Sequence, residues 1–188
     1  MKIAVSNLAW DPDEDDLVAE LLQSLRIRGL EIAPTRIWER PLDSTARDRV
    51  EYRQRWTERE FEIVSLQALL FGRQDLVIFE SPTSRAATLD YLRGIIDLAS
   101  DVGARRLVFG SPRNRLVGGK EPDEINAIAL PFFRAVGDAA VDRGVVFCIE
   151  PNPAEYGCDW INSVEEGLQF VRQVSHPGIA LNADSAGI

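Results

Sequence analysis

The sequence predicts an α/β protein built on a parallel sheet. Short runs rich in apolar and β-branched residues alternate with longer stretches that have the apolar periodicity of helices. The runs are almost continuously apolar, which is typical of parallel strands covered on both faces. The hairpin dipeptides Asn-Gly and Asp-Gly do not occur. The six predicted strands are Ile3–Ser6, Leu30–Ala33, Ile63–Leu70, Leu107–Gly110, Val145–Glu150 and Ile179–Asn182.

The first helix is predicted to follow the first strand directly. Asp11 serves as its N-cap, Pro12 takes the first helical position, and Glu14 stands three residues after the cap. Gly29 is expected to end the helix. Its inward, apolar face is expected to consist of Leu17, Val18, Leu21, Leu22 and Leu25.

Four more helical segments follow the next four strands. Ser84 and Ser163 are the expected N-caps of two of them, and Gly103 and Gly144 are expected ends. Pro131 lies inside a helical pattern and implies a kink or a local break there. The four segments span residues 43–60, 84–103, 122–144 and 163–174.

Two architectures fit six strands that alternate with five helices. An open, doubly wound sheet would be well filled by 188 residues, whereas a closed barrel of eight β/α units usually needs about 250 residues. No linker, low-complexity tract or charge block divides the chain. A single domain spanning residues 1–188 is therefore expected.

Composition excludes several kinds of partner. The net charge of −9 argues against a nucleic-acid partner, because nucleic-acid binding needs a basic surface. Charges interrupt every apolar stretch, so no membrane span is expected, and the N-terminus shows no secretory signal. A cytoplasmic protein follows. The two cysteines do not make a disulfide framework, and Cys148 is predicted to be a buried small hydrophobe.

Polar and aromatic residues gather where the predicted strands end, and ligands bind beyond those ends in both architectures. Trp10 and Tyr156 would stack on the face of a ligand or cover the core. Arg113 and Arg115 would grip a phosphate or carboxylate, or form a solvated loop. The candidate substrate-binding residues are Asn7, Trp10, Gln67, Arg113, Arg115, Asn152 and Tyr156.

Two carboxylates occupy equivalent positions after neighbouring strands. Glu150 closes the fifth apolar run, and Asp184 follows the sixth. Carboxylates at the mouths of adjacent parallel strands can share a divalent metal. The alternative is that each caps a helix or pairs with an arginine.

The segment Glu150–Pro153, with His176–Gly178 and Leu181–Asp184, resembles the sugar phosphate isomerase/epimerase family of xylose isomerase-like barrels. The resemblance covers the whole chain in the right order. It implies a parallel (β/α) barrel of the TIM type, truncated to about six β/α units. Further similar segments are Ser6–Trp10, Ser65–Gly72, Gly110–Arg115 and Tyr156–Asn162.

The resemblance implies a metal-dependent isomerase or epimerase that acts on a sugar or sugar phosphate. Proton transfer would pass through an enediolate. Glu150 and Asp184 would be ligands of Mn²⁺, Mg²⁺, Co²⁺ or Zn²⁺, and Glu150 would also be catalytic. Related members complete the metal site with a histidine on strand seven and a glutamate on strand eight, and this sequence contains neither strand.

The missing strands leave an alternative open. The chain would then be a non-catalytic module that binds a sugar or another small molecule, or a truncated gene product. Uncovered strand edges favour pairing with a second chain, so a homo-oligomer is also expected.

Overall fold

The structure is a computed structural model that describes residues 2–185. Its strands are β1 (Ala4–Ser6), β2 (Gly29–Ile32), β3 (Glu62–Leu66), β4 (Arg106–Phe109), β5 (Val146–Ile149) and β6 (Ile179–Leu181). Its α-helices are α1 (Asp15–Ser24), α2 (Ala46–Thr57), α3 (Pro82–Val102), α4 (Pro122–Asp142) and α5 (Val164–Val174).

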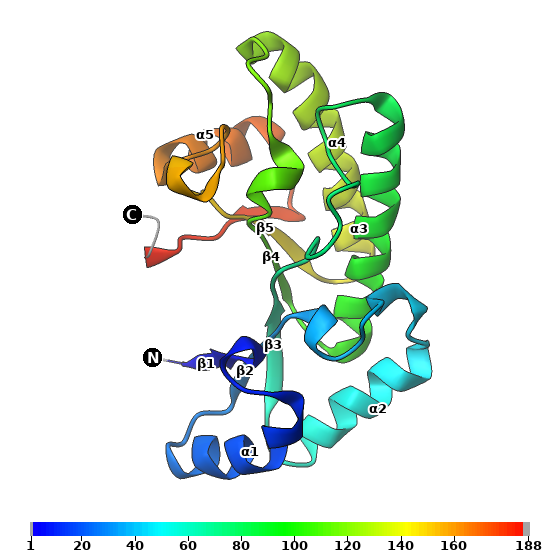
Figure 1. Cartoon of the computed structure of the whole chain (residues 1–188), viewed down its shortest axis with the longest axis vertical. Helices are drawn as coiled ribbons and strands as arrows, with labels where there is room; N and C mark the ends of the chain where they lie inside the picture. The colour runs from blue at the N-terminus through cyan, green and yellow to red at the C-terminus, as the bar shows by residue number, and fades with distance from the viewer. Residues whose placement is uncertain (1, 186–188) are drawn as a thin grey trace.

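The six strands form one parallel sheet in the order of the sequence, β1-β2-β3-β4-β5-β6. A doubly wound sheet reverses its strand order at a switch point, so this order excludes that architecture. Right-handed crossovers between successive strands place the helices on one side of the sheet. Figure 1 shows the helices on the outside of the curved sheet, and β1 at one edge of the sheet. The predicted class, a parallel α/β fold, is confirmed.

The third strand differs most from its prediction. Residues 63–70 are predicted as one strand, but β3 ends at Leu66, and Ala68 has a left-handed backbone with φ of 54°. Leu69 and Leu70 are nevertheless buried. Their apolar character reflects a turn packed into the core, and an apolar run alone does not distinguish this from a longer strand.

Three helices depart from their predicted details. Helix α3 begins at Pro82 with Ser81 as its cap, and the Ser84 amide donates to Ser81 Oγ at 3.0 Å, so Ser84 is not the cap. Helix α2, capped by Thr45, is shorter than residues 43–60. Helix α4 is continuous through Pro131, where a kink or a local break is predicted, so no break occurs there. Pro131 is exposed, as is Ala127 one turn earlier, so water can solvate the carbonyl that loses its partner.

Helix α1 buries a different face from the one predicted. A 3₁₀ turn over Pro12–Glu14 precedes it, and within the helix only Ala19 and Leu22 are buried. Leu17, Leu21 and Leu25 are exposed, so their prediction as inward-facing residues is wrong. The five apolar residues cover two adjacent stripes of the helix, and only the stripe of Leu22 joins the core.

The core lies between the sheet and the helices. Phe109 of β4 and Phe147 of β5 pack against Phe133 of α4, with ring centroids 5.9 and 6.4 Å away. Trp160 and Phe170 extend this aromatic cluster towards α5. Cys148 and Cys158 are buried free thiols, so the prediction of a buried Cys148 is confirmed. Within residues 2–185, none of the helices has the length and apolarity needed to span a bilayer.

Leu22 and Leu21 provide a matched test of the buried face of α1. Leu22 is 5% exposed and Leu21 is 56% exposed. We expect Leu22→Ala to lower the free energy of unfolding by about 2–5 kcal/mol, because it leaves a cavity. Leu21→Ala should stay within about 0.5 kcal/mol of the unsubstituted protein. Urea unfolding followed by circular dichroism measures both. Equal losses would contradict the exposed position of Leu21.

Candidate functional site

A row of polar side chains crosses the first three strands at their carboxyl ends. The parallel register pairs Ser6 with Glu31, and Glu31 with Ser65. Residues paired in this way share one face of the sheet. Ser65 Oγ donates to Glu31 Oε1 at 2.8 Å, and Gln67 Nε2 donates to Ser6 Oγ. The sheet therefore presents hydroxyl, amide and carboxyl groups together on the side that the helices do not cover.

Glu150 lies at the end of β5 and is held by amide groups. Its Oε1 accepts from Asn182 Nδ2 at 2.8 Å, and its Oε2 accepts from Asn152 Nδ2 at 3.3 Å. No ion pair to Glu150 occurs within residues 2–185. Gly110 of the neighbouring strand end leaves it room, because a Cβ there would lie 2.6 Å from Glu150 Oε2. The carboxylate is thus oriented without a direct salt bridge.

Glu31 is a further member of this acidic group that the sequence reading missed. Burial raises the pKa of Glu31; the hydrogen bond from Ser65 opposes this effect, and the charges of Glu150 and Asp184 add to it. Three carboxyl groups from different parts of the sheet therefore interact. In the sequence, the sign that could have identified Glu31 is its position as a single charged residue inside the apolar run of residues 30–33.

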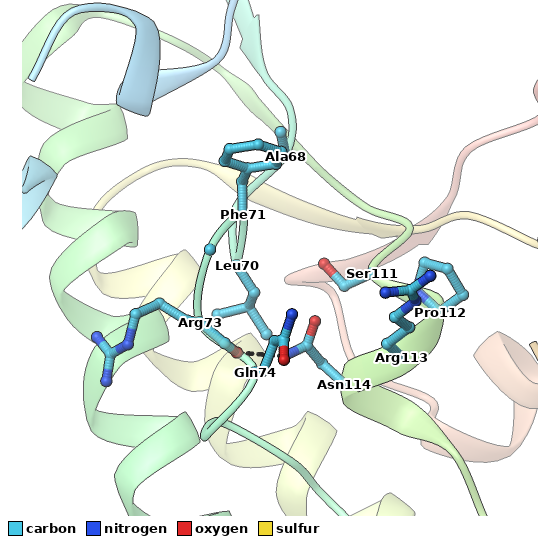
Figure 2. Close-up of a pocket in the computed structure, with 10 residues that line it drawn as sticks. Ala68, Leu70, Phe71, Arg73, Gln74, Ser111, Pro112, Arg113 and Asn114 are labelled. Carbon is cyan, nitrogen blue, oxygen red and sulfur yellow. Dashed lines mark hydrogen bonds between the residues drawn. The ribbon is translucent and has the colours of Figure 1, made fainter. Parts of the chain in front are cut away.

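The two predicted arginine contacts have opposite environments. Arg115 is completely buried, and its Nη2 donates to the Glu150 backbone oxygen at 2.8 Å. Its Nε and Nη1 have no hydrogen-bond partner in the described part of the chain. Burial lowers the pKa of Arg115, while the Cys158 thiol and Glu150 oppose that shift. Arg113 is exposed and lines a pocket beside β4 (Figure 2).

The other predicted substrate contacts are placed as follows. Asn7 is buried, and its Oδ1 accepts from the Ala33 amide at 2.8 Å. Trp10 is buried in the core, and its Nε1 donates to Asp15 Oδ1 at 2.8 Å. Tyr156 is exposed in the loop after β5. The structure thus joins Asn152 and Arg115 to Glu150, and Gln67 to Ser6. In the described residues no hydrogen bond links Trp10, Arg113 or Tyr156 to either group.

Glu150 and Asp184 are the two residues that the sequence predicts as metal ligands. Glu150 and Asp184 follow the paired strands β5 and β6, and the Asn182 amide donates to the Ile149 oxygen at 2.8 Å between them. Residues 2–185 contain no group of three or more His, Cys, Asp or Glu side chains that could hold a metal. Mg²⁺ usually binds one or two carboxylates and completes its shell with water and substrate oxygens. Two carboxylates therefore suit such an ion better than zinc, which favours nitrogen and sulfur ligands.

A sequence model of the xylose isomerase-like TIM barrel matches residues 8–186. The chain belongs to this xylose isomerase-like family. The match confirms the resemblance stated from the residues. No curated protein sequence matches the chain significantly.

Solved structures agree with this family fold. D-psicose 3-epimerase from Clostridium cellulolyticum H10, solved with D-tagatose, has a TM-score of 0.78 at 15% identity, covering 100% of this chain and 64% of the enzyme. The 3-keto-D-glucoside 4-epimerase YcjR from E. coli has a TM-score of 0.73 at 18% identity, with 100% and 69% covered. The IOLI protein with a bound zinc atom has a TM-score of 0.70 at 16% identity, with 96% and 62% covered. The xylose isomerase-like chain thus spans less than two thirds of the psicose epimerases.

The raised pKa of Glu31 predicts that Glu31→Gln stabilises the fold by an amount that depends on pH. A carboxyl whose pKa is higher in the folded state destabilises the fold as pH rises above its unfolded pKa, because the charged form is disfavoured. We expect Glu31→Gln to raise the melting temperature at pH 7. The gain should shrink as pH falls towards the ordinary pKa of a glutamate. Thermal unfolding from pH 4 to pH 8 measures this, and a pH-independent loss of stability would refute it.

Proposed function

We propose that this xylose isomerase-like protein is a metal-dependent sugar or sugar phosphate isomerase or epimerase that moves a proton next to a carbonyl. The observation that carries this proposal is the position of the Glu150 carboxylate, which follows β5 and is held by two side-chain amides. It has no salt bridge within the described residues, and Asp184 follows the neighbouring strand β6. Sugar epimerases among the structural neighbours support the same reaction class.

In this proposal, the two carboxylates have related tasks. Glu150 and Asp184 bind a divalent ion such as Mn²⁺, Mg²⁺, Co²⁺ or Zn²⁺, and their oxygen donors favour the first two. Such an ion, when bound, stabilises negative charge that develops on the substrate oxygens. Glu150 takes and returns the proton at the carbon beside the carbonyl.

Neighbouring residues position these groups and the substrate. Asn152 and Asn182 fix the orientation of the Glu150 carboxylate, and Arg115 fixes its backbone. Glu31 of β2 and Gln67, which follows β3, offer hydrogen bonds to sugar hydroxyls. The remaining proposed substrate contacts are Asn7, Trp10, Arg113 and Tyr156.

A second function, sugar binding without turnover, has its own supporting observation. The described residues contain no group of three or more potential metal-ligating side chains. We also propose that the protein acts in the cytoplasm and self-associates. Light scattering at several concentrations tests the association.

Metal binding has a direct test. Isothermal titration with MnCl₂ and with MgCl₂ should detect binding to the unsubstituted chain. Glu150→Gln and Asp184→Asn should each weaken it at least about tenfold, because each removes a charged ligand. Glu165→Gln, an exposed change in the first turn of α5, is the matched control and should bind normally. Equal binding by all four proteins would exclude a site at Glu150 and Asp184.

Proton transfer is tested by solvent exchange. With MgCl₂ in D₂O, we expect ketoses such as D-fructose and D-psicose to exchange the hydrogen on the carbon beside their carbonyl for deuterium, which NMR follows. Glu150→Gln should slow the exchange by about 10²–10⁴-fold, the usual contribution of a general base. Ketose binding without any exchange would favour the binding module instead.

A further inference from the structure

A pocket of about 450 Å³ opens between the segments that follow β3 and β4. Figure 2 shows these two segments facing each other, with residues 68–74 on one side and residues 111–114 on the other. This volume is in the range of small-molecule sites, which is roughly 300–1,000 Å³. The proposed function assigns only Arg113 to a role here, and no role to the pocket itself.

The pocket begins where the candidate site ends. Gln67, which contacts Ser6, is followed by Ala68, and Gly110, which adjoins Glu150, is followed by Ser111. Ala68 and Ser111 both have left-handed backbones, with φ of 54° and 37°. Such conformations are disfavoured for residues with a side chain and gather at functional sites. Two residues that line the pocket therefore directly follow, along the chain, the residues that contact Ser6 and adjoin Glu150.

Buried hydrogen bonds fix the two walls to each other. Asn114 Nδ2 donates to the backbone oxygens of Arg73 and Leu76, at 2.7 Å each. The backbone oxygen of Asn114 accepts from the Ile78 backbone amide at 3.0 Å. Asn114 is itself buried. The pocket is therefore formed before a ligand arrives, which lowers the ordering cost of binding.

The lining combines apolar surface with unused hydrogen-bonding groups. Leu70 forms a buried part of the wall. The Phe71 side chain is 71% exposed, so its apolar ring is accessible from solvent. In the described residues the side chains of Gln74, Ser111 and Arg113 make no hydrogen bond or ion pair. A sugar ring has apolar C–H faces and a rim of hydroxyls, and this lining complements both.

The pocket is poorly suited to a phosphate group. Arg73 is already bound by Asp75, with contacts of 2.9 and 2.7 Å, and lies over the Tyr91 ring. Pro112 has no amide hydrogen, so the turn after Ser111 cannot surround an anion with backbone donors as phosphate sites do. Arg113 alone remains as a cation in an acidic protein.

We propose that this pocket binds the neutral, non-reacting ring of a glycoside or disaccharide whose other ring lies at Glu150. The inference rests on the proposed function and narrows its substrate class. Phe71 stacks on the face of the non-reacting ring, and Gln74, Ser111 and Arg113 bind its hydroxyls.

Ligand-observed and protein-observed NMR test this with defined probes: cellobiose, maltose and sucrose against D-glucose, D-fructose and D-glucose 6-phosphate. We expect at least one disaccharide to bind at least fivefold more tightly than the monosaccharides and to shift the amide signals of residues 68–74 and 111–114. Phe71→Ala should remove that advantage. Val141→Ala, an exposed apolar change on α4, is its control and should preserve it. Gln74→Ala should weaken the disaccharide about threefold or more, while Arg172→Ala, an exposed change on α5, should not.

Three results would overturn the proposal: no disaccharide binding, an unchanged preference in folded Phe71→Ala, or tighter binding of D-glucose 6-phosphate that Arg113→Ala abolishes. The melting temperature of each variant confirms folding. These binding measurements need no turnover, so failure of proton exchange would remove the proposed enzyme while leaving the subsite intact. If disaccharide binding were lost and proton exchange retained, the subsite would be refuted and the proposed enzyme would stand.

Discussion

Every strand of the sheet pairs in parallel only with its neighbours in the sequence, and the rest of the molecule depends on this order. Right-handed connections between adjacent strands put the helices on one side. That side buries Phe109 and Phe147 against α4. The other side carries side chains that no helix covers, and it can therefore hold Ser6, Glu31 and Ser65 in one row. The polar site and the apolar core therefore lie on opposite faces of the same sheet.

The uncovered side concentrates carboxyl groups at a cost. Burial disfavours the charged form of Glu31, and the charges of Glu150 and Asp184 add to this penalty. The amides of Asn152 and Asn182 orient Glu150 but do not neutralise it. A group of this kind gains stability from a bound cation or from a proton. Both outcomes are consistent with the proposed centre, which would hold a metal and move a proton.

Much of this fold was predictable, because buried parallel strands are almost continuously apolar and the segments between them have helical periodicity. Periodicity shows which residues share a face of a helix, but not which neighbour covers that face, so Leu17, Leu21 and Leu25 were assigned to the core wrongly. Glu31 was missed because its meaning comes from the register with Ser65. That register is a property of strand pairing and is not visible in a single run.

The site residues show the same limit. Glu150 and Asp184 could be proposed as candidates because strand ends are identifiable in the sequence. Arg113 and Arg115 stand two positions apart and looked equivalent, yet one is exposed and the other is buried beneath Glu150. The 3₁₀ turn over residues 112–115 separates them, since positions two apart on a tight helix point in different directions.

The end of β4 couples the two halves of the proposed substrate site. Gly110 has to lack a side chain, because a Cβ there would displace Glu150 Oε2, and Ser111 then turns the chain into the wall of the pocket. The carboxylate and the pocket therefore depend on consecutive residues of one strand end. A shift of that end by a fraction of an ångström would move both together. The spacing between a reacting ring and its neighbouring ring would thus be set by the backbone of β4, and not by the flexible side chains around it.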